Sequence, residues 1–293
     1  MANLKEIRNR ITSVSSTKQI TSAMKMVSAA KLRKAQDAVT QMRPYANKLQ
    51  EILSNLSRSL DSSDGIYSQE REVKNVLIVS ITSNRGLCGG FNNNVIKAAK
   101  KLANNKYKDS TVTVLSIGKK SNDAFKNTEL GIKGTELPRH AETIWDDLTF
   151  ENSSLIATTL MEQFAKGNQD KIILIYNQFK NAAVQEIMEE QFLPVLPPQS
   201  DNVETANSVD YIFEPSKEFI VQELIPKSLK TQLFKALLDS QASEHGARMT
   251  AMHKATDNAS DLIDELKLSY NKARQAAITG EILEIVGGAE ALG

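Results

Sequence analysis

The residues that most suggest chemistry lie in the loop Arg85–Gly90, which reads RGLCGG. We expect this loop to join a buried strand to a helix, and backbone N–H groups at such a junction can bind phosphate. Its glycines fit neither the G-x-G-x-x-G spacing of a dinucleotide-binding loop nor a P-loop, which ends in Gly-Lys-Ser or Gly-Lys-Thr. We therefore interpret the loop as a structural tight turn and predict no nucleotide or other cofactor.

The three histidines are too scattered to indicate a metal site. His245 and His253 are eight residues apart on an expected helix, roughly 12 Å along its axis, so they cannot share an ion. His140 lies far away in the sequence, no His-Glu-x-x-His motif occurs, and the single cysteine, Cys88, cannot form a thiolate site. We predict no metal ligands.

Two pairs of adjacent carboxylates, Asp146-Asp147 and Glu189-Glu190, are the remaining candidates for acid–base catalysis. Charges that are adjacent in sequence usually form a solvated patch, and no nucleophile accompanies either pair. The sequence thus predicts no catalytic residue, and we expect a protein that is not itself an enzyme.

The composition points to a folded protein that binds other proteins. The chain has 293 residues, of which 41% are hydrophobic, and its formal net charge of +1 argues against nucleic-acid binding. From Met1 to Arg43, however, the sequence contains nine Lys and Arg residues and only two carboxylates, which predicts an acidic partner surface there. A lone cysteine suits a reducing compartment. Neither a signal peptide nor a membrane span is recognisable, so we expect no direct insertion into a membrane.

A very long helix is expected from Ser216 to Val286. Small and apolar residues recur there in alternating steps of three and four, which places them on one side of a helix. This stripe consists of Met252, Ala255, Ala259, Leu262, Leu266, Ser269, Ala273 and Ala276. Ser216 is a suitable N-cap and Gly287-Gly288 a suitable stop, while Pro226 either kinks the helix or occupies its first turn. Even about 60 residues would make a helix roughly 90 Å long.

A second long helix is expected at the N-terminus. Its stripe weakens in the middle, and its members are Leu4, Ile7, Ile11 and Val14, then loosely Ile20, Met24 and Val27, then Ala35, Ala38, Met42, Tyr45, Leu49, Ile52 and Leu56. Pro44 should bend this helix without ending it, because the pattern stays in phase on both sides. The turn composition of residues 61–65 ends it.

An α/β pattern lies between these helices. Apolar or β-branched runs predict strands at 76–82, 111–117 and 171–176, with edge strands at 185–192 and 209–213. Helical segments at 91–102, 121–126 and 152–165 alternate with them, which favours a largely parallel sheet. We therefore assign the α/β fold class, with a long antiparallel coiled coil of the terminal helices and an inserted Rossmann-like α/β domain. The predicted divisions are residues 1–60, 61–215 and 216–293.

The inserted domain also sets the register of the helix pair. If residue 60 lies beside residue 216, equal rise along both helices brings Leu4 near residue 272 and Met24 near Met252. The last 20 or so residues then extend beyond the N-terminal helix. They are apolar on several sides, through Ile278, Ile282, Leu283, Ile285 and Val286. We expect an apolar collar from another chain around them.

Several motifs in order resemble the gamma-subunit family of F-type ATP synthases. They are Ile7–Ile11 (IRNRI), residues 17–34 (TKQITSAMKMVSAAKLRK), Arg43–Ala46 (RPYA), Arg85–Gly90, Ser243–Met252 (SEHGARMTAM), Ala255–Ala259 (ATDNA) and Asn271–Thr279 (NKARQAAIT). The resemblance covers the whole chain. It implies a non-catalytic central-stalk rotor in a ring of three alpha and three beta subunits, with the α/β domain beside epsilon and the membrane c-ring. Such a subunit couples c-ring rotation to conformational change in the catalytic beta subunits of a proton-translocating synthase.

The same resemblance assigns contact residues. Met24 and Lys25 correspond to the shaft segment that faces acidic lever loops of beta, and Arg274 and Gln275 to a pair that contacts another beta loop. Asn84 stands where many family members have aspartate, which removes any role for a carboxylate there. The absence of a cysteine-bearing insert argues against thiol control.

No transit peptide is recognisable, which favours a bacterial source or a mature organellar chain. A bacterial source, which we adopt, implies a peripheral protein on the cytoplasmic side of the bacterial inner (plasma) membrane. Two alternatives remain at this point: a coiled-coil adaptor protein without a rotary role, and an α/β enzyme whose helical ends only dimerise it.

Overall fold

The computed structural model describes residues 4–57, 66–69, 71–195 and 217–290. The expected N-cap Ser216, the turn at 61–65 and the edge strand at 209–213 lie outside the described residues. The chain forms two compact units, Met1–Ala29 with Arg248–Gly293, and Ala30–Ala247.

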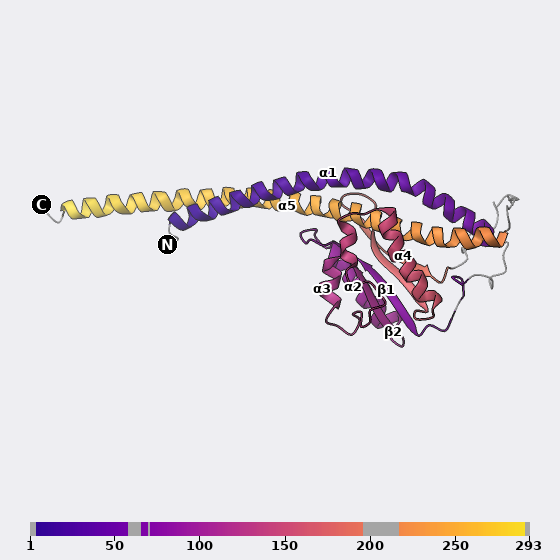
Figure 1. The fold of residues 1–293 in the computed structure, drawn as a ribbon. Coiled ribbons are helices and arrows are strands. Elements are labelled where there is room, and N and C mark those ends of the chain that lie inside the picture. The colour runs from indigo at the N-terminus through magenta and orange to yellow at the C-terminus, as the bar shows by residue number, and fades with distance from the viewer. Residues whose placement is uncertain (1–3, 58–65, 70, 196–216, 291–293) are drawn as a thin grey trace. The chain divides into compact units, whose positions relative to one another are not determined.

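Two long helices contribute to both units (Figure 1). Helix α1 spans Leu4–Ser57 and contains Pro44, and helix α5 spans Lys217–Glu290 and contains Pro226. Pro44 thus does not end α1, as predicted. The predicted stop at Gly287-Gly288 is wrong, because α5 continues to Glu290. Glycine costs a helix only about 1 kcal/mol relative to alanine, which weakens the last turns without breaking their hydrogen bonds.

In the first unit, α1 and α5 run antiparallel. Thr256 Oγ1 donates to Thr21 Oγ1 at 2.8 Å, and nearer the N-terminus Arg8 Nη2 donates to Tyr270 Oη at 2.8 Å. The equal-rise register places Thr21 opposite residue 255 and Arg8 opposite residue 268. The observed partners are one and two residues further along, so the antiparallel pairing and its register are confirmed.

The structure corrects which residues fill the seam between these helices. On α1, Ile20 and Val27 are exposed while Thr21 and Ser28 are buried. The buried positions therefore continue in steps of seven from Ile7, and small polar side chains occupy two of them. The prediction had instead chosen the neighbouring apolar residues, which lie one position earlier in the heptad.

On α5 the predicted stripe is wrong at Leu262. Leu262 is 43% exposed, whereas its neighbour Ile263 is 8% exposed. Met252 and Ala259 are buried as predicted. The choice between two adjacent apolar residues depends on the side from which the partner approaches, and periodicity alone does not encode it.

The second unit is built on a four-stranded sheet. The strands are β1 (Asn75–Ile81), β2 (Thr111–Ile117), β3 (Lys171–Phe179) and β4 (Gln185–Leu193), in the order β2-β1-β3-β4. Strand β1 pairs parallel to β2 and β3, with Val76 opposite both Val112 and Lys171, and β4 is an antiparallel edge. The largely parallel Rossmann-like sheet is thus confirmed, including the edge strand near 185–192.

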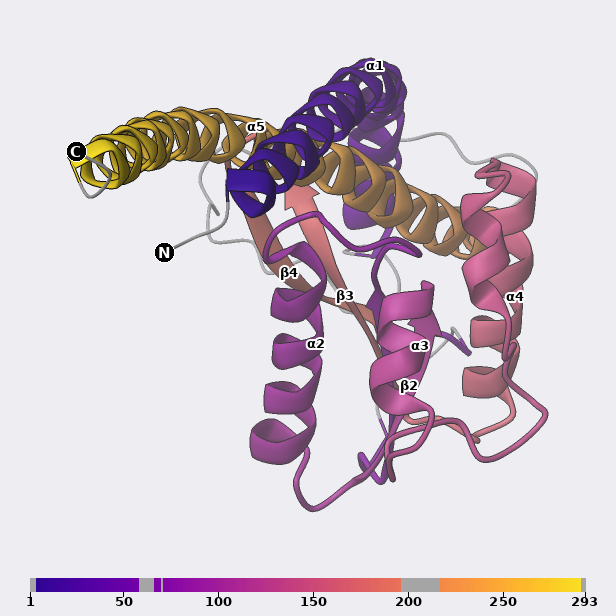
Figure 2. The ribbon, with the colours of Figure 1, turned by 90° about the vertical axis from the view of Figure 1, so that its left-hand side faces the viewer.

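Helices cover both faces of this sheet (Figure 2). Helices α2 (Phe91–Lys101) and α3 (Lys119–Phe125) pack on one face, and α4 (Phe150–Ala165) with the part of α5 around Leu229–Leu237 packs on the other. Each face has its own apolar core, because the strands alternate side chains such as Leu77 and Ile78 between them. The Thr149 hydroxyl caps α4 by accepting from the backbone N–H of Asn152.

Two short elements escaped the sequence-based prediction. A π-helical turn, Leu102–Lys106, continues α2, and a 3-10 helix, Ala141–Trp145, lies between α3 and α4. Single turns of this kind are too short to produce a recognisable hydrophobic period.

Candidate functional site

The glycine loop after β1 is held by a buried polar network. Asn92 Oδ1 accepts from the backbone N–H of Ser83 at 2.9 Å, and Asn92 Nδ2 donates to the Cys88 Sγ at 3.2 Å. Ser83 Oγ donates to the Arg85 backbone oxygen at 2.7 Å. Leu87 is 65% exposed at φ 63°, so its backbone is left-handed. These bonds give the loop a role as a structural turn, as predicted from its spacing.

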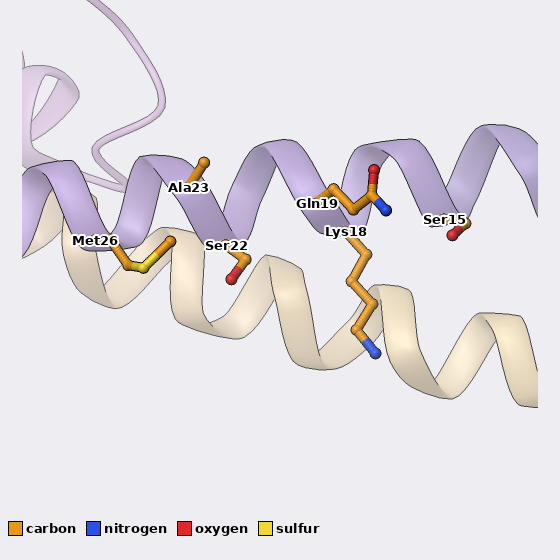
Figure 3. Close-up of a pocket in the computed structure, with 6 residues that line it drawn as sticks. All are labelled: Ser15, Lys18, Gln19, Ser22, Ala23 and Met26. Atoms are coloured by element: carbon orange, nitrogen blue, oxygen red, sulfur yellow. The ribbon is translucent and has the colours of Figure 1, made fainter.

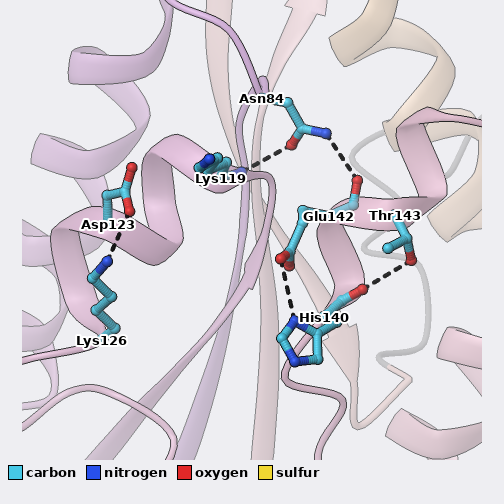
Figure 4. A network of polar contacts seen from close by, with 7 residues as sticks. All are labelled: Asn84, Lys119, Asp123, Lys126, His140, Glu142 and Thr143. Carbon is cyan, nitrogen blue, oxygen red and sulfur yellow. Dashed lines mark hydrogen bonds and ion pairs between the residues drawn. The ribbon is translucent and has the colours of Figure 1, made fainter.

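Asn84, just before this loop, joins two further segments (Figure 4). Its Nδ2 donates to the backbone oxygen of Glu142 at 3.0 Å, and its Oδ1 accepts from the backbone N–H of Lys119 at 2.9 Å. The side chain thus uses one donor and one acceptor at once, which an ionised aspartate could not do. An amide at this position joins the start of α3, which follows β2, to the 3-10 helix Ala141–Trp145.

Two of the three histidines lie beside carboxylates of their own segments. His140 Nδ1 lies 3.4 Å from Glu142 Oε1, and His253 Nδ1 lies 3.2 Å from Asp257 Oδ2 one helical turn away. Within the described part of the chain, no group of three His, Cys, Asp or Glu side chains could hold a metal ion.

The carboxylate pairs serve structural hydrogen bonds. Asp147 accepts from the side chain of Asn152 near the start of α4. Glu190 was predicted to be part of a solvated patch, and this is wrong: Glu190 is half-buried and accepts from Tyr176 Oη at 2.7 Å and from Gln232 Nε2 at 2.8 Å. Burial beside Glu190 raises the pKa of Tyr176 far above its ordinary value, so its hydroxyl stays protonated and continues to donate.

The predicted contact residues Met24 and Lys25 lie in the first unit and are half-buried. Beside them, a shallow groove of about 430 Å³ follows one face of α1 (Figure 3). Its lining residues are Ser15, Lys18, Gln19, Ser22, Ala23 and Met26. The side chain of Lys18 extends from α1 toward α5. Met26 and its neighbour Val27 are 65% and 57% exposed, so this part of α1 presents cations beside apolar side chains.

The other predicted contact residues lie further along α5. Arg274 and Gln275 are exposed, and Ile278, Ile282 and Ile285 are 49%, 54% and 72% exposed. Every residue from 281 to 290 is exposed. Met24 lies near the level of Met252, so Arg274 is about 33 Å further along the axis. The structure thus separates the predicted contacts into two surfaces, which we call the mid-helix surface (residues 15–27) and the α5 tip (residues 274–290).

Sequence reasoning missed a polar junction in the second unit. Arg43 Nη2 on α1 contacts Asp239 Oδ1 on α5 at 3.2 Å. The two residues are 196 positions apart, so no local spacing could have paired them. The RPYA motif drew attention to Arg43 but did not indicate which residue it contacts.

Comparisons with known proteins give one consistent result. A family model described as ATP synthase matches residues 3–292. ATP synthase gamma chains from Flavobacterium johnsoniae and Christiangramia forsetii are 64% and 63% identical over 293 residues, which is 100% of this chain and 99% of each relative.

Solved structures give the same fold. The central stalk/c-ring structure of the Tetrahymena thermophila mitochondrial ATP synthase contains a similar chain, 25% identical with a TM-score of 0.56, covering 80% of this chain and 99% of that one. A rotor chain of the Euglena gracilis mitochondrial ATP synthase reaches a TM-score of 0.62 at 22% identity, over 94% of this chain and 98% of that one. Within the described residues, no helix has the length and apolar character to cross a membrane.

Proposed function

Because this chain belongs to the ATP synthase gamma chain family and is a non-catalytic central-stalk subunit of that complex, we propose that it couples rotation of a membrane c-ring to conformational change in catalytic beta subunits. The complex would be a proton-translocating F-type ATP synthase. The observation that supports this coupling role is the exposed α5 tip, where Ile278, Ile282 and Ile285 are 49%, 54% and 72% exposed. An apolar helix end of this kind needs a surrounding partner.

The α5 tip fits the inner surface of a ring of alpha and beta subunits. Contacts from isoleucine and valine are non-directional, so such a collar can hold the tip and still let it turn. Arg274 and Gln275 would form the directional contacts, because a guanidinium can grip a carboxylate on one beta subunit at a time. A charge-assisted hydrogen bond of roughly 1.5–3 kcal/mol can bias one conformational state without locking the rotor.

The mid-helix surface would meet beta at a second level. Lys25 and Lys18 supply positive charge beside exposed Met26, which suits an acidic lever loop that also carries apolar side chains. We include Met24 in this contact because it is half-buried at the same level of α1.

The α/β domain, within the proposed division 61–215, would contact epsilon and the c-ring. This arrangement would hold the protein peripherally on the cytoplasmic side of a bacterial inner membrane. The proposal involves no bound cofactor and no nucleic acid.

Copurification tests the proposal. A tagged chain expressed in its own host should come down with alpha, beta and epsilon in a complex that hydrolyses ATP, and with c subunits when membranes are solubilised gently. The isolated chain should hydrolyse no ATP. A coiled-coil adaptor would instead bring down other partners without ATPase activity, and recovery of such a set would contradict the rotary role.

A further inference from the structure

A partly buried ion pair joins three elements of the second unit: the side chain of Asp239 is fully buried, and that of Arg43 is 45% exposed. Arg43 Nη2 on α1 lies 3.2 Å from Asp239 Oδ1 on α5, and the same nitrogen donates to the backbone oxygen of Phe179 at 3.1 Å. Phe179 is the last residue of β3. A single guanidinium therefore links α1, β3 and α5, and we call this contact the Arg43 joint.

Stability alone gives little reason for the Arg43 joint. The Asp239 side chain is 0% exposed, and its Oδ2 has no hydrogen-bond partner among the described residues. Burial raises the pKa of Asp239 above its ordinary value, although Arg43 and Lys235 act in the opposite direction. Apolar replacement of an ion pair with a buried member is often neutral or stabilising, so stability alone accounts poorly for this pair.

Neighbouring contacts show that the Arg43 joint connects α1 to a sheet that already holds α5. Helix α5 is already fastened to the sheet, because Ser243 Oγ donates to the backbone oxygen of Asn177 at 3.0 Å and Gln232 Nε2 donates to Glu190. At Gly246 an added Cβ would lie 3.2 Å from Ala182 Cα, so the helix also meets the β3–β4 hairpin closely. Arg43 brings α1 to the same end of β3.

We propose that Arg43 is the positioning residue through which torque passes between the α/β domain and helices α1 and α5. This inference rests on the proposed rotary function. Apolar contacts resist separation but are non-directional, so they oppose sliding weakly. A charge-assisted hydrogen bond has a defined direction and length, and it resists tangential displacement of the helices across the end of β3.

Two variants separate this role from simple stabilisation. Arg43→Met leaves a buried carboxylate unpaired, so the isolated chain should lose thermal stability. Arg43→Met combined with Asp239→Asn also removes the charge and should recover most of that stability while the directional link stays missing. In membranes with equal amounts of assembled complex, we expect both variants to lower the ratio of proton-driven ATP synthesis to ATP hydrolysis several-fold.

Matched controls complete the test. Lys180 and Glu186 form an ion pair of 3.0 Å at the β3–β4 hairpin, and both side chains are about half exposed. Lys180→Met with Glu186→Gln should leave the ratio unchanged. If the Met variants of Arg43 do not assemble, Arg43→Lys decides the question, because it keeps the charge but replaces the planar guanidinium by an ammonium on a shorter side chain, which changes the length and direction of both bonds. A lowered synthesis-to-hydrolysis ratio in Arg43→Lys would support the proposed role of the Arg43 joint.

Recovery of both stability and the synthesis-to-hydrolysis ratio in the double variant would overturn the inference, as would an unchanged ratio in Arg43→Lys. Failure of the unmodified chain to form an ATP-hydrolysing complex would instead contradict the proposed function itself, so the two failures are distinguishable.

Discussion

The hydroxyl of Thr256 on α5 lies 2.8 Å from the hydroxyl of Thr21 on α1, within a seam that also buries Ser28, Met252 and Ile263. Thr256 is also within 2.8 Å of the backbone oxygen of Met252, and Thr21 is bonded to the backbone oxygen of Lys18. Each hydroxyl has one proton to donate. The bond between the helices therefore competes with the bond from Thr256 to Met252 inside α5, whereas Thr21 can accept from Thr256 while it donates to Lys18. The contact indicates the register more than it strengthens the pair.

This register predicts a disulfide. Thr21→Cys with Thr256→Cys should crosslink under mild oxidation, because the two side chains already meet across the seam. Thr21→Cys with Ile263→Cys is the control, since Ile263 lies roughly 10 Å further along the axis, beyond the Cα separation that a disulfide can span. Non-reducing gel mobility and mass spectrometry of peptides measure both. A crosslink in the control at the rate of the first pair would refute the register.

The chain's connectivity made the register predictable, because two helices that leave and re-enter one domain must pair from a common base. The facing side was harder to predict. Leu262 and Ile263 are both apolar and adjacent, so a heptad can be drawn through either. The apolar residues Ile20 and Val27 were predicted to face the partner helix, but the polar residues Thr21 and Ser28 do so, because they continue the seven-residue spacing from Ile7. The Arg43–Asp239 contact could not be predicted from the sequence, because it depends on where the folded sheet places Phe179.

Gly118 is predicted to be irreplaceable. Its φ is 127°, and an added Cβ would lie 2.0 Å from the backbone oxygen of Thr82. Gly118→Ala should therefore lower the free energy of unfolding by about 3 kcal/mol or more, through overlap and backbone strain together. Gly280→Ala is the control, because nothing lies within 4 Å of its Cβ position, and it should stabilise α5 by roughly 0.5–1 kcal/mol. Denaturant unfolding of both variants checks the contrast, and equal effects would contradict it.

Asn84→Asp should weaken the contact between the loop after β1 and the 3-10 helix Ala141–Trp145. The variant keeps the acceptor for the Lys119 N–H but loses the donor to the Glu142 backbone oxygen, which should cost about 1–3 kcal/mol at neutral pH. A protonated aspartic acid can donate again, so the deficit should shrink as the pH falls through the pKa of the new carboxyl group. Unfolding curves of both proteins from pH 7 to pH 4 measure this. A deficit that stays constant with pH would show that the donor is unimportant.

The two parts of the α5 tip should separate assembly from turnover. A chain shortened after Thr279 loses Ile282 and Ile285, so it should give less assembled complex while each complex formed keeps most of its turnover. Arg274→Ala with Gln275→Ala should assemble normally and hydrolyse ATP roughly tenfold more slowly, as expected when a charge-assisted hydrogen bond is lost from a rate-limiting state. Complex yield on gel filtration measures assembly, and ATP hydrolysis per assembled complex measures turnover. Full turnover in the double variant would mean that this pair is solvated helix surface.

The central claim, that this chain turns within a ring of catalytic subunits, is tested most directly by watching it turn. A single Lys101→Cys substitution on the exposed side of α2 would carry a bead, with the ring of alpha and beta subunits fixed to glass. Addition of ATP should produce unidirectional, stepwise rotation of the bead that stops when ATP is removed. Continued ATP hydrolysis by complexes whose beads stay still, with the bead shown to be attached through that cysteine, would contradict the account.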